Sequence, residues 1–82
     1  MHYTYLIKSI KEKWVYVGST SDLVKRIEKH NKGLVKSTKY YKPFNLVYYE
    51  AYRTLSQARK REFEIKNNSQ QKEIILKRIG LT

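Results

Sequence analysis

The chain has 82 residues, which is enough for one small domain with a single hydrophobic core. It has no cysteine, which excludes disulfides, a thiol nucleophile and a cysteine-ligated zinc site, and two histidines are too few for a histidine-rich metal centre. Lysine and arginine total 18 against 7 acidic residues, a net charge of +11. This excess predicts a polyanionic partner, above all a nucleic acid. A merely soluble basic surface or a ribosome-associated protein is the alternative on charge alone.

The sequence gives no sign of export or membrane insertion. Its first residues lack the apolar segment of a signal peptide, and no stretch approaches the roughly 18 apolar residues of a spanning helix. No predicted helix is strongly basic on one face and apolar on the other, as a helix lying on a membrane would be. We therefore expect a cytoplasmic protein with no membrane partner.

The first half of the chain predicts two strands and a helix. Residues 3–8 and 14–18 are rich in β-branched and aromatic side chains and are expected to form a hairpin. Gly18 is expected to permit a tight turn out of the second strand. A helix is predicted to begin with Ser19 as its cap, in a capping-box-like pattern with Asp22, and to run to about Asn31 before stopping near Gly33.

The second half predicts a loop, a strand and two helices. Residues 34–44 form a basic, aromatic loop, and residues 45–52 are expected to form a third strand. Thr54 and Gln57 make a capping box for a helix through about Lys66, and Ser69 is the predicted cap of a last helix ending near Gly80. The order ββαβαα, with one short sheet, predicts a layered α/β (α+β) fold for residues 1–82 as a single domain.

One carboxylate falls where an apolar residue is expected. At about 100° per residue, Ala58 and Ile65 lie on the apolar stripe of their helix, and Glu62 lies within that stripe. A carboxylate on an inward face must be paired or bound to a cation. Two interpretations remain open: a structural ion pair with Arg59 or Lys66, or a metal ligand facing a cleft.

The first helix carries two further candidates at the edge of its buried face. Arg26 and His30 are one turn apart, next to the apolar stripe formed by Leu23, Val24 and Ile27. The simpler interpretation is a surface pair between Asp22 and Arg26, with His30 capping or packing. On the strands, alternation allows Tyr5 and Tyr16 to share one face of the hairpin in a suitable register.

The loop at residues 34–44 is a candidate nucleic-acid contact. Positive charges alternate with aromatic rings there, a combination that follows a phosphate backbone while stacking on bases. The residues concerned are Lys36, Lys39, Tyr40 and Lys42. An ordinary solvated loop is the alternative.

Together these residues give the chain a resemblance to the GIY-YIG nuclease family, especially to its small single-domain bacterial members and to the N-terminal domain of the excision-repair nuclease. Tyr3-Thr4-Tyr5 stands at the first family signature and Tyr16-Val17-Gly18 at the second. Arg26 matches the helix arginine, His30 a position often held by histidine or tyrosine, and Glu62 the metal-binding glutamate. The first signature departs from the family, because Tyr3 and Thr4 replace glycine and isoleucine.

The resemblance implies a three-stranded sheet flanked by helices and hydrolysis of DNA phosphodiester bonds with one Mg²⁺ or Mn²⁺ ion at Glu62. Arg26 would clamp the phosphoryl oxygens, Tyr5 or Tyr16 would orient or deprotonate the attacking water, and His30 would relay a proton. The chain has no room for a separate sequence-reading domain. We therefore expect targeting by DNA structure (branched, nicked or single-stranded) or by a protein partner. A binding module that retains the fold without catalysis is the alternative.

Overall fold

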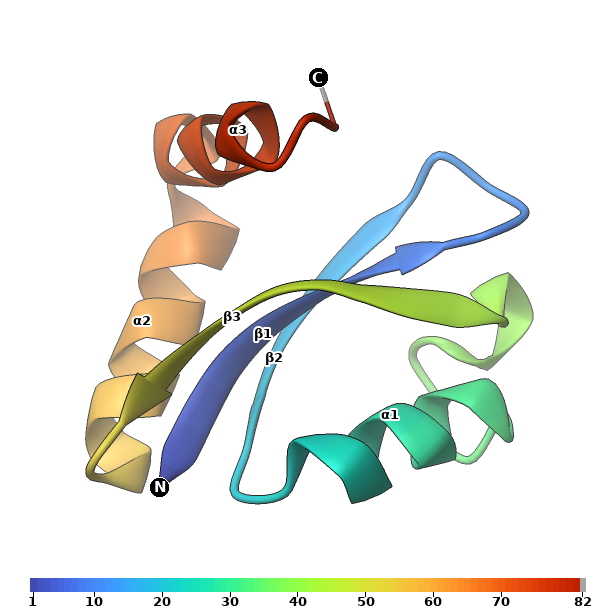
Figure 1. The fold of residues 1–82 in the computed structure, drawn as a ribbon, viewed down its shortest axis with the longest axis horizontal. Coiled ribbons are helices and arrows are strands. Elements are labelled where there is room, and N and C mark those ends of the chain that lie inside the picture. Colours follow the sequence, from blue (N-terminus) through green and yellow to red (C-terminus); the bar gives the residue numbers. More distant parts are fainter. Residues whose placement is uncertain (82) are drawn as a thin grey trace.

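The computed structural model describes residues 1–81 and contains one antiparallel sheet of three strands with helices on both faces (Figure 1). The strands are β1 (His2–Ser9), β2 (Val15–Thr20) and β3 (Phe44–Tyr52), in the order β2-β1-β3. The helices are α1 (Leu23–Asn31), α2 (Leu55–Asn67) and α3 (Ser69–Arg78), with a short 3-10 turn η1 (Lys39–Tyr41) before β3. The predicted α+β class and the order ββαβαα are confirmed.

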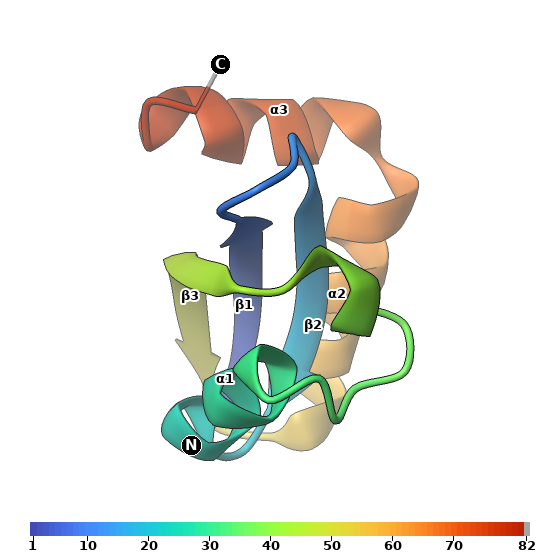
Figure 2. The same cartoon turned by 90° about the vertical axis from the view of Figure 1, so that its right-hand side faces the viewer.

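Each face of the sheet has its own hydrophobic cluster. Helices α2 and α3 cover one face, and α1 with the loop that follows it covers the other (Figures 1 and 2). The cluster under α2 and α3 is built on Leu6, Val17, Ile65 and Ile75. The cluster under α1 is built on Tyr5, Ile7 and Phe44, against which Trp14, Tyr16, Leu23 and Ile27 pack. Val24, which was expected to support the apolar stripe of α1, is 71% exposed instead.

The hairpin register brings the two signature segments together. Tyr5 lies opposite Gly18, and Ile7 lies opposite Tyr16. Directly opposed residues of an antiparallel pair point to the same face, so Tyr5 and Tyr16 both face α1. The expectation that the two tyrosines share a face is confirmed.

The predicted cap of α1 is wrong. Asp22 is the N-cap, and its side chain accepts a hydrogen bond from the backbone N–H of Lys25. Ser19 lies inside β2, because that strand stays paired with β1 as far as Thr20. Because of the pairing with β1, the helix begins further along the chain than predicted. The local pattern of Ser19 and Asp22 carries no information about this pairing.

The caps of the C-terminal helices follow the local sequence more closely. The Thr54 and Gln57 capping box is present at the start of α2. Helix α3 is capped by Asn68, one residue before the predicted Ser69, through bonds from Gln70 and Gln71. None of the helices within residues 1–81 combines the length and the apolar character needed to cross a bilayer.

Candidate active site

A series of contacts around the outer edge of β2 connects five of the residues singled out in the sequence: Tyr5, Tyr16, Arg26, His30 and Glu62. This strand is an edge strand, with α2 on one side and the α1 layer on the other (Figure 2). Because side chains alternate along a strand, Tyr16 and Gly18 face the α1 layer while Ser19 faces α2. The edge of β2 is therefore where groups from the two layers approach each other.

A buried cluster of three polar side chains lies on the α1 side of this edge. The Tyr5 hydroxyl lies 2.8 Å from His30 Nε2, and Arg26 Nε donates to the same hydroxyl at 3.3 Å. Tyr5 and His30 are both 0% exposed, whereas Arg26 is half-buried. Arg26 thus turns inward to Tyr5, and the carboxylate of Asp22, its expected surface partner, caps α1 instead.

Thr38 extends this cluster into the loop that follows α1. Its hydroxyl lies 2.8 Å from His30 Nδ1 and 3.4 Å from the carbonyl oxygen of Val35, and its side chain is fully buried. The sequence does not single out Thr38, because residues 34–44 are expected to form an exposed loop, either a nucleic-acid contact or an ordinary solvated loop. The only sign in the sequence is a threonine among lysines and tyrosines, and this pattern does not by itself predict a buried side chain.

Gly18 makes room for Tyr5. A Cβ at this position would lie 2.6 Å from Tyr5 Cζ and closer still to the hydroxyl. Positive φ occurs at Gly33 and Gly80, whereas Gly18 continues β2 in extended conformation. The predicted role in a tight turn is therefore wrong: glycine is needed here for space rather than for backbone freedom.

Tyr16 stands beside this cluster but is less enclosed. It is half-buried, and its ring centre lies 5.4 Å from that of His30. The ammonium group of Lys66, from α2, lies 5.2 Å from the centre of the same ring. Lys66 therefore reaches around the edge of β2 and links the two layers of the site.

Glu62 completes the site from the α2 side. It is half-buried; Ser19 Oγ donates to one carboxylate oxygen at 2.6 Å, and Lys66 Nζ donates to the other at 2.6 Å. The ion pair anticipated for Glu62 thus forms with Lys66 rather than with Arg59. Arg59, Phe63 and Lys66 surround Glu62 in a shallow surface hollow on α2.

Burial and charge set the protonation states in the cluster. Burial raises the pKa of Tyr5, opposed by the hydrogen bond and positive charge of Arg26, while Tyr16 and Glu62 raise it further. Burial also lowers the pKa of His30 to about 4, and the charge of Arg26 adds to this effect. His30 is therefore neutral at pH 7, with one ring nitrogen free to accept a hydrogen bond.

The donor set around Glu62 fits a single hard cation with few protein ligands. A half-buried carboxylate and a serine hydroxyl offer oxygen atoms, and a Mg²⁺-like ion keeps several of its waters. Lys66 is the present counter-ion, and because its side chain is 41% exposed it is able to move aside. No group of three or more histidine, aspartate or glutamate side chains suited to a metal is found within residues 1–81.

Comparison with known proteins identifies the family of this chain. The GIY-YIG catalytic domain family matches residues 1–74, which include every residue of the cluster and Glu62. The chain belongs to the GIY-YIG family. It is 47% identical to a UPF0213 protein of Staphylococcus saprophyticus and 43% identical to one of Staphylococcus aureus, in each case over 92% of both chains. The solution structure of a UPF0213 protein from Bacillus halodurans is similar, with a TM-score of 0.54, 36% identity, and coverage of 92% of this chain and 80% of the other.

The departure from the first GIY-YIG signature is accommodated by contacts elsewhere. Thr4, at the isoleucine position, is fully buried, and its hydroxyl donates to the carbonyl oxygen of Ala58 at 2.7 Å. Tyr3, at the glycine position, packs edge-to-face against Tyr49 with ring centres 5.9 Å apart. Both substitutions support the sheet, and Tyr5 keeps its place opposite Gly18.

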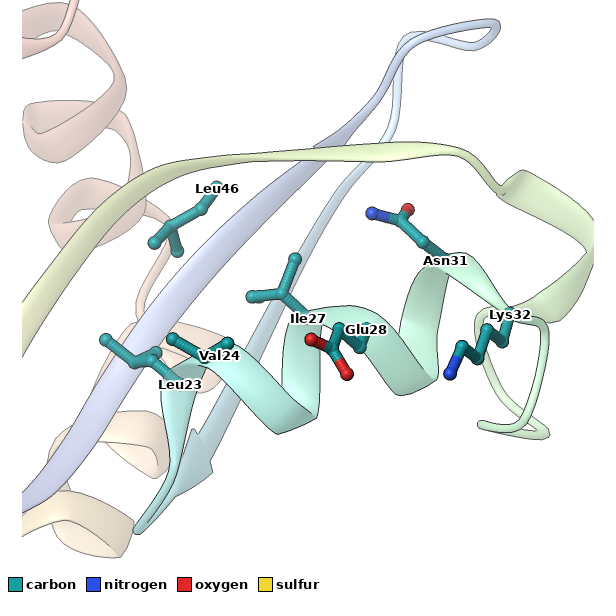
Figure 3. A pocket seen from close by; sticks show the side chains of 7 residues that line it. All are labelled: Leu23, Val24, Ile27, Glu28, Asn31, Lys32 and Leu46. Atoms are coloured by element: carbon teal, nitrogen blue, oxygen red, sulfur yellow. The ribbon is translucent and has the colours of Figure 1, made fainter.

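Two surfaces lie outside this GIY-YIG site. The predicted nucleic-acid loop is exposed at Lys36, Lys39, Tyr40 and Lys42, with Lys39 Nζ 5.1 Å from the centre of the Tyr40 ring. An apolar hollow of about 480 Å³ lies between α1 and β3, lined mainly by Leu23, Val24, Ile27 and Leu46 (Figure 3). None of the residues lining that hollow takes part in the hydrogen bonds of Tyr5 or Glu62, so the hollow is distinct from the polar groups of the candidate active site.

Proposed function

We propose that this GIY-YIG protein is a metal-dependent DNA endonuclease that hydrolyses phosphodiester bonds at the edge of β2. The observation that supports it most is a series of side-chain contacts around one strand edge that connects the Arg26 guanidinium, the Tyr16 phenol and the Glu62 carboxylate. Lys66 joins two of them, because it bonds Glu62 and lies against the Tyr16 ring. Phosphoryl transfer needs positioning and charge stabilisation more than covalent chemistry from the protein.

Arg26 is assigned to the phosphoryl group. Its bond to Tyr5 uses Nε and leaves the fork of terminal nitrogens to other partners. That fork matches two oxygens of a phosphate, and it stabilises the additional negative charge of the transition state. Helix α1 holds the guanidinium at the rim of the buried cluster, where a phosphate is able to approach it.

Tyr16, rather than Tyr5, is assigned to the attacking water. A direct role requires hydrogen-bond reach to that water, and Tyr5 is fully buried beneath Gly18. Tyr16 is half-buried at the strand edge and lies next to the groups that would face a substrate. Of the two tyrosines that sequence reasoning left open, Tyr16 is the one with access.

Glu62 is assigned to a divalent ion, Mg²⁺ or Mn²⁺. Such an ion, when bound, polarises the scissile phosphate and stabilises the leaving oxygen. Ser19 holds one carboxylate oxygen in place, and release of Lys66 from the other would open the carboxylate to the cation. Lys66 would then be free to contact the DNA backbone.

The surface around the site suits a nucleic acid with accessible bases. The net charge is +11, and Lys36, Lys39 and Lys42 are exposed in the loop beside α1. Phe63 is 67% exposed next to Glu62, with Arg59 and Lys66 in the same hollow. An exposed ring between cations is suited to stacking on an unpaired base. Nicked, branched or single-stranded DNA is therefore the proposed substrate, with a protein partner as a further means of targeting.

Cleavage assays with matched variants test this proposal. Purified protein is incubated with nicked, branched, single-stranded and intact duplex DNA in the presence of Mg²⁺ or Mn²⁺. We expect cleavage by the wild type and a large fall in its rate in Glu62→Gln and Arg26→Ala. Glu64→Gln serves as the control, since Glu64 is an exposed carboxylate on the same helix, away from Ser19 and Tyr16. Equal cleavage by the Glu62 and Glu64 variants would refute the assignment.

A binding module without catalysis is the second candidate, and one observation favours it. Both oxygens of Glu62 are already engaged within the chain, by Ser19 and by Lys66. If that ion pair stays closed, the carboxylate holds no metal. Salt-sensitive DNA binding with no cleavage of any substrate, together with no change in the Glu62 signals when Mn²⁺ is added, would establish this alternative.

A further inference from the structure

We infer that Thr38, His30 and Tyr5 form a buried chain of hydrogen bonds that aims the Arg26 guanidinium, with Thr38 as its anchor. The inference rests on the proposed role of Arg26 in binding the scissile phosphate. It makes the three buried side chains positioning residues rather than groups that touch the substrate. Tyr5, His30 and Thr38 are each 0% exposed, so only Arg26 connects the chain with the surface.

The donors and acceptors available to these side chains fix the direction in which each hydrogen bond of this chain is donated. Arg26 Nε–H has only a donor role, so the Tyr5 oxygen accepts it and the Tyr5 hydroxyl proton is directed to His30 Nε2. His30 then carries its proton on Nδ1 and donates it to the Thr38 oxygen. The Thr38 hydroxyl donates in turn to the carbonyl oxygen of Val35, which fixes the far end of the chain to the backbone.

The reverse arrangement leaves a buried donor without a partner. If Thr38 donated to Nδ1, His30 would be protonated on Nε2 and would donate to Tyr5. The Tyr5 oxygen would then accept from both His30 and Arg26, and its own proton would have no acceptor in a fully enclosed site. An unsatisfied buried donor is costly, so the tautomer protonated on Nδ1 is favoured.

The surroundings of His30 support a neutral ring. Arg26 approaches from α1, Tyr5 from β1 and Tyr16 from β2, while Phe44 of β3 packs edge-on at 5.8 Å between ring centres. Burial disfavours a second proton on the ring, and the positive charge of Arg26 adds to this effect. His30 therefore remains able to accept the Tyr5 proton in its hydrogen bond at neutral pH.

The consequence is a fixed direction for the Arg26 fork. Arg26 has a long and flexible side chain, and the bond at Nε restricts the plane of the guanidinium. Misplacement of a positioning group by about 1 Å is able to cost on the order of 100-fold in rate. Thr38 is connected to Arg26 through three successive hydrogen bonds. Removal of the Thr38 hydroxyl should therefore lower turnover more than substrate affinity.

Nuclear magnetic resonance tests the chain without any assay of activity. In ¹⁵N–¹H spectra of the histidine rings at pH 7, we expect wild-type His30 to be protonated on Nδ1. Thr38→Ser, which keeps the hydroxyl, should preserve this tautomer, and Thr38→Val should shift it toward Nε2. A wild-type His30 protonated on Nε2 would overturn the inference, and that measurement requires no variant to fold.

Kinetics then test whether the chain acts through Arg26. We expect Thr38→Val to lower kcat by about 10-fold or more with little change in KM, and Thr38→Ser to restore it. In an Arg26→Ala background, Thr38→Val should have no further effect on the residual rate. A further loss there would show that Thr38 acts elsewhere. If the wild type cleaves no DNA, the proposed function fails. The hydrogen-bond chain is then still tested by the tautomer of the His30 ring and by the protection of the Arg26 Nε–H from exchange.

Discussion

Substitution of Gly18 by alanine should perturb both folding and the site, because the added methyl group collides with Tyr5. The new Cβ would lie 2.6 Å from Tyr5 Cζ and 3.0 Å from Cε1. Tyr5 is enclosed on all sides and has no solvent-filled space into which to move. Overpacking of this kind costs roughly 1–3 kcal/mol, and a displaced hydroxyl loses bonds worth about 0.5–1.5 kcal/mol each. We expect the free energy of unfolding to fall by about 2–4 kcal/mol.

Urea denaturation and thermal melting measure this loss, and each kcal/mol corresponds to about 4–8 °C in Tm for a domain of this size. Introducing Gly18→Ala into two Tyr5 variants tests whether the Tyr5 ring causes this loss of stability. Tyr5→Phe keeps Cζ and should leave most of the cost, whereas Tyr5→Leu removes the ring and should abolish most of it. A Gly18→Ala variant as stable as the wild type, or one with the same cost in all three backgrounds, would refute the steric argument.

Three further predictions concern other parts of the molecule. Burial tends to raise the pKa of Glu50, but hydrogen bonds from Arg61, Tyr48 and Tyr52 hold it below the usual 4.5. The ionised Glu50 carboxylate therefore stabilises the fold above about pH 4.5, and this stabilisation is lost as the pH falls through the lowered pKa. Glu50→Gln should cost about 1–3 kcal/mol at pH 7 and flatten the acid side of the curve of urea midpoint against pH. A variant with glutamine in place of three exposed loop lysines tests the loop; the lysines are Lys36, Lys39 and Lys42. The magnitude of the slope of log K for DNA binding against log salt, measured by fluorescence titration, should fall by about 2 to 3. Phe63→Leu, which keeps apolar bulk but removes the aromatic face, should weaken single-strand binding by about 1–3 kcal/mol while leaving duplex binding unchanged by the same titration.

The sequence predicted the elements and their order well because most of the relevant signals are local. Strand residues alternate, the Thr54 capping box opens α2, and the loop before β3 interrupts both patterns. The errors occur where a distant segment decides the outcome. The strand β2 continues to Thr20 because β1 offers partners that far, and this places Asp22 rather than Ser19 at the start of α1.

The sequence by itself determined which residue types the site contains: an arginine and a histidine one turn apart, a carboxylate within an apolar stripe, and two tyrosines that share a face. It did not determine how these groups meet. Ser19 bonds Glu62 across 43 positions, and Lys66 reaches Tyr16 only because α2 packs behind the edge strand. Burial then distinguishes the two tyrosines, since the same packing encloses Tyr5 and leaves Tyr16 half-buried. Periodicity specifies the face on which a side chain lies, whereas only the packing of two layers against one sheet specifies what that side chain contacts and whether water reaches it.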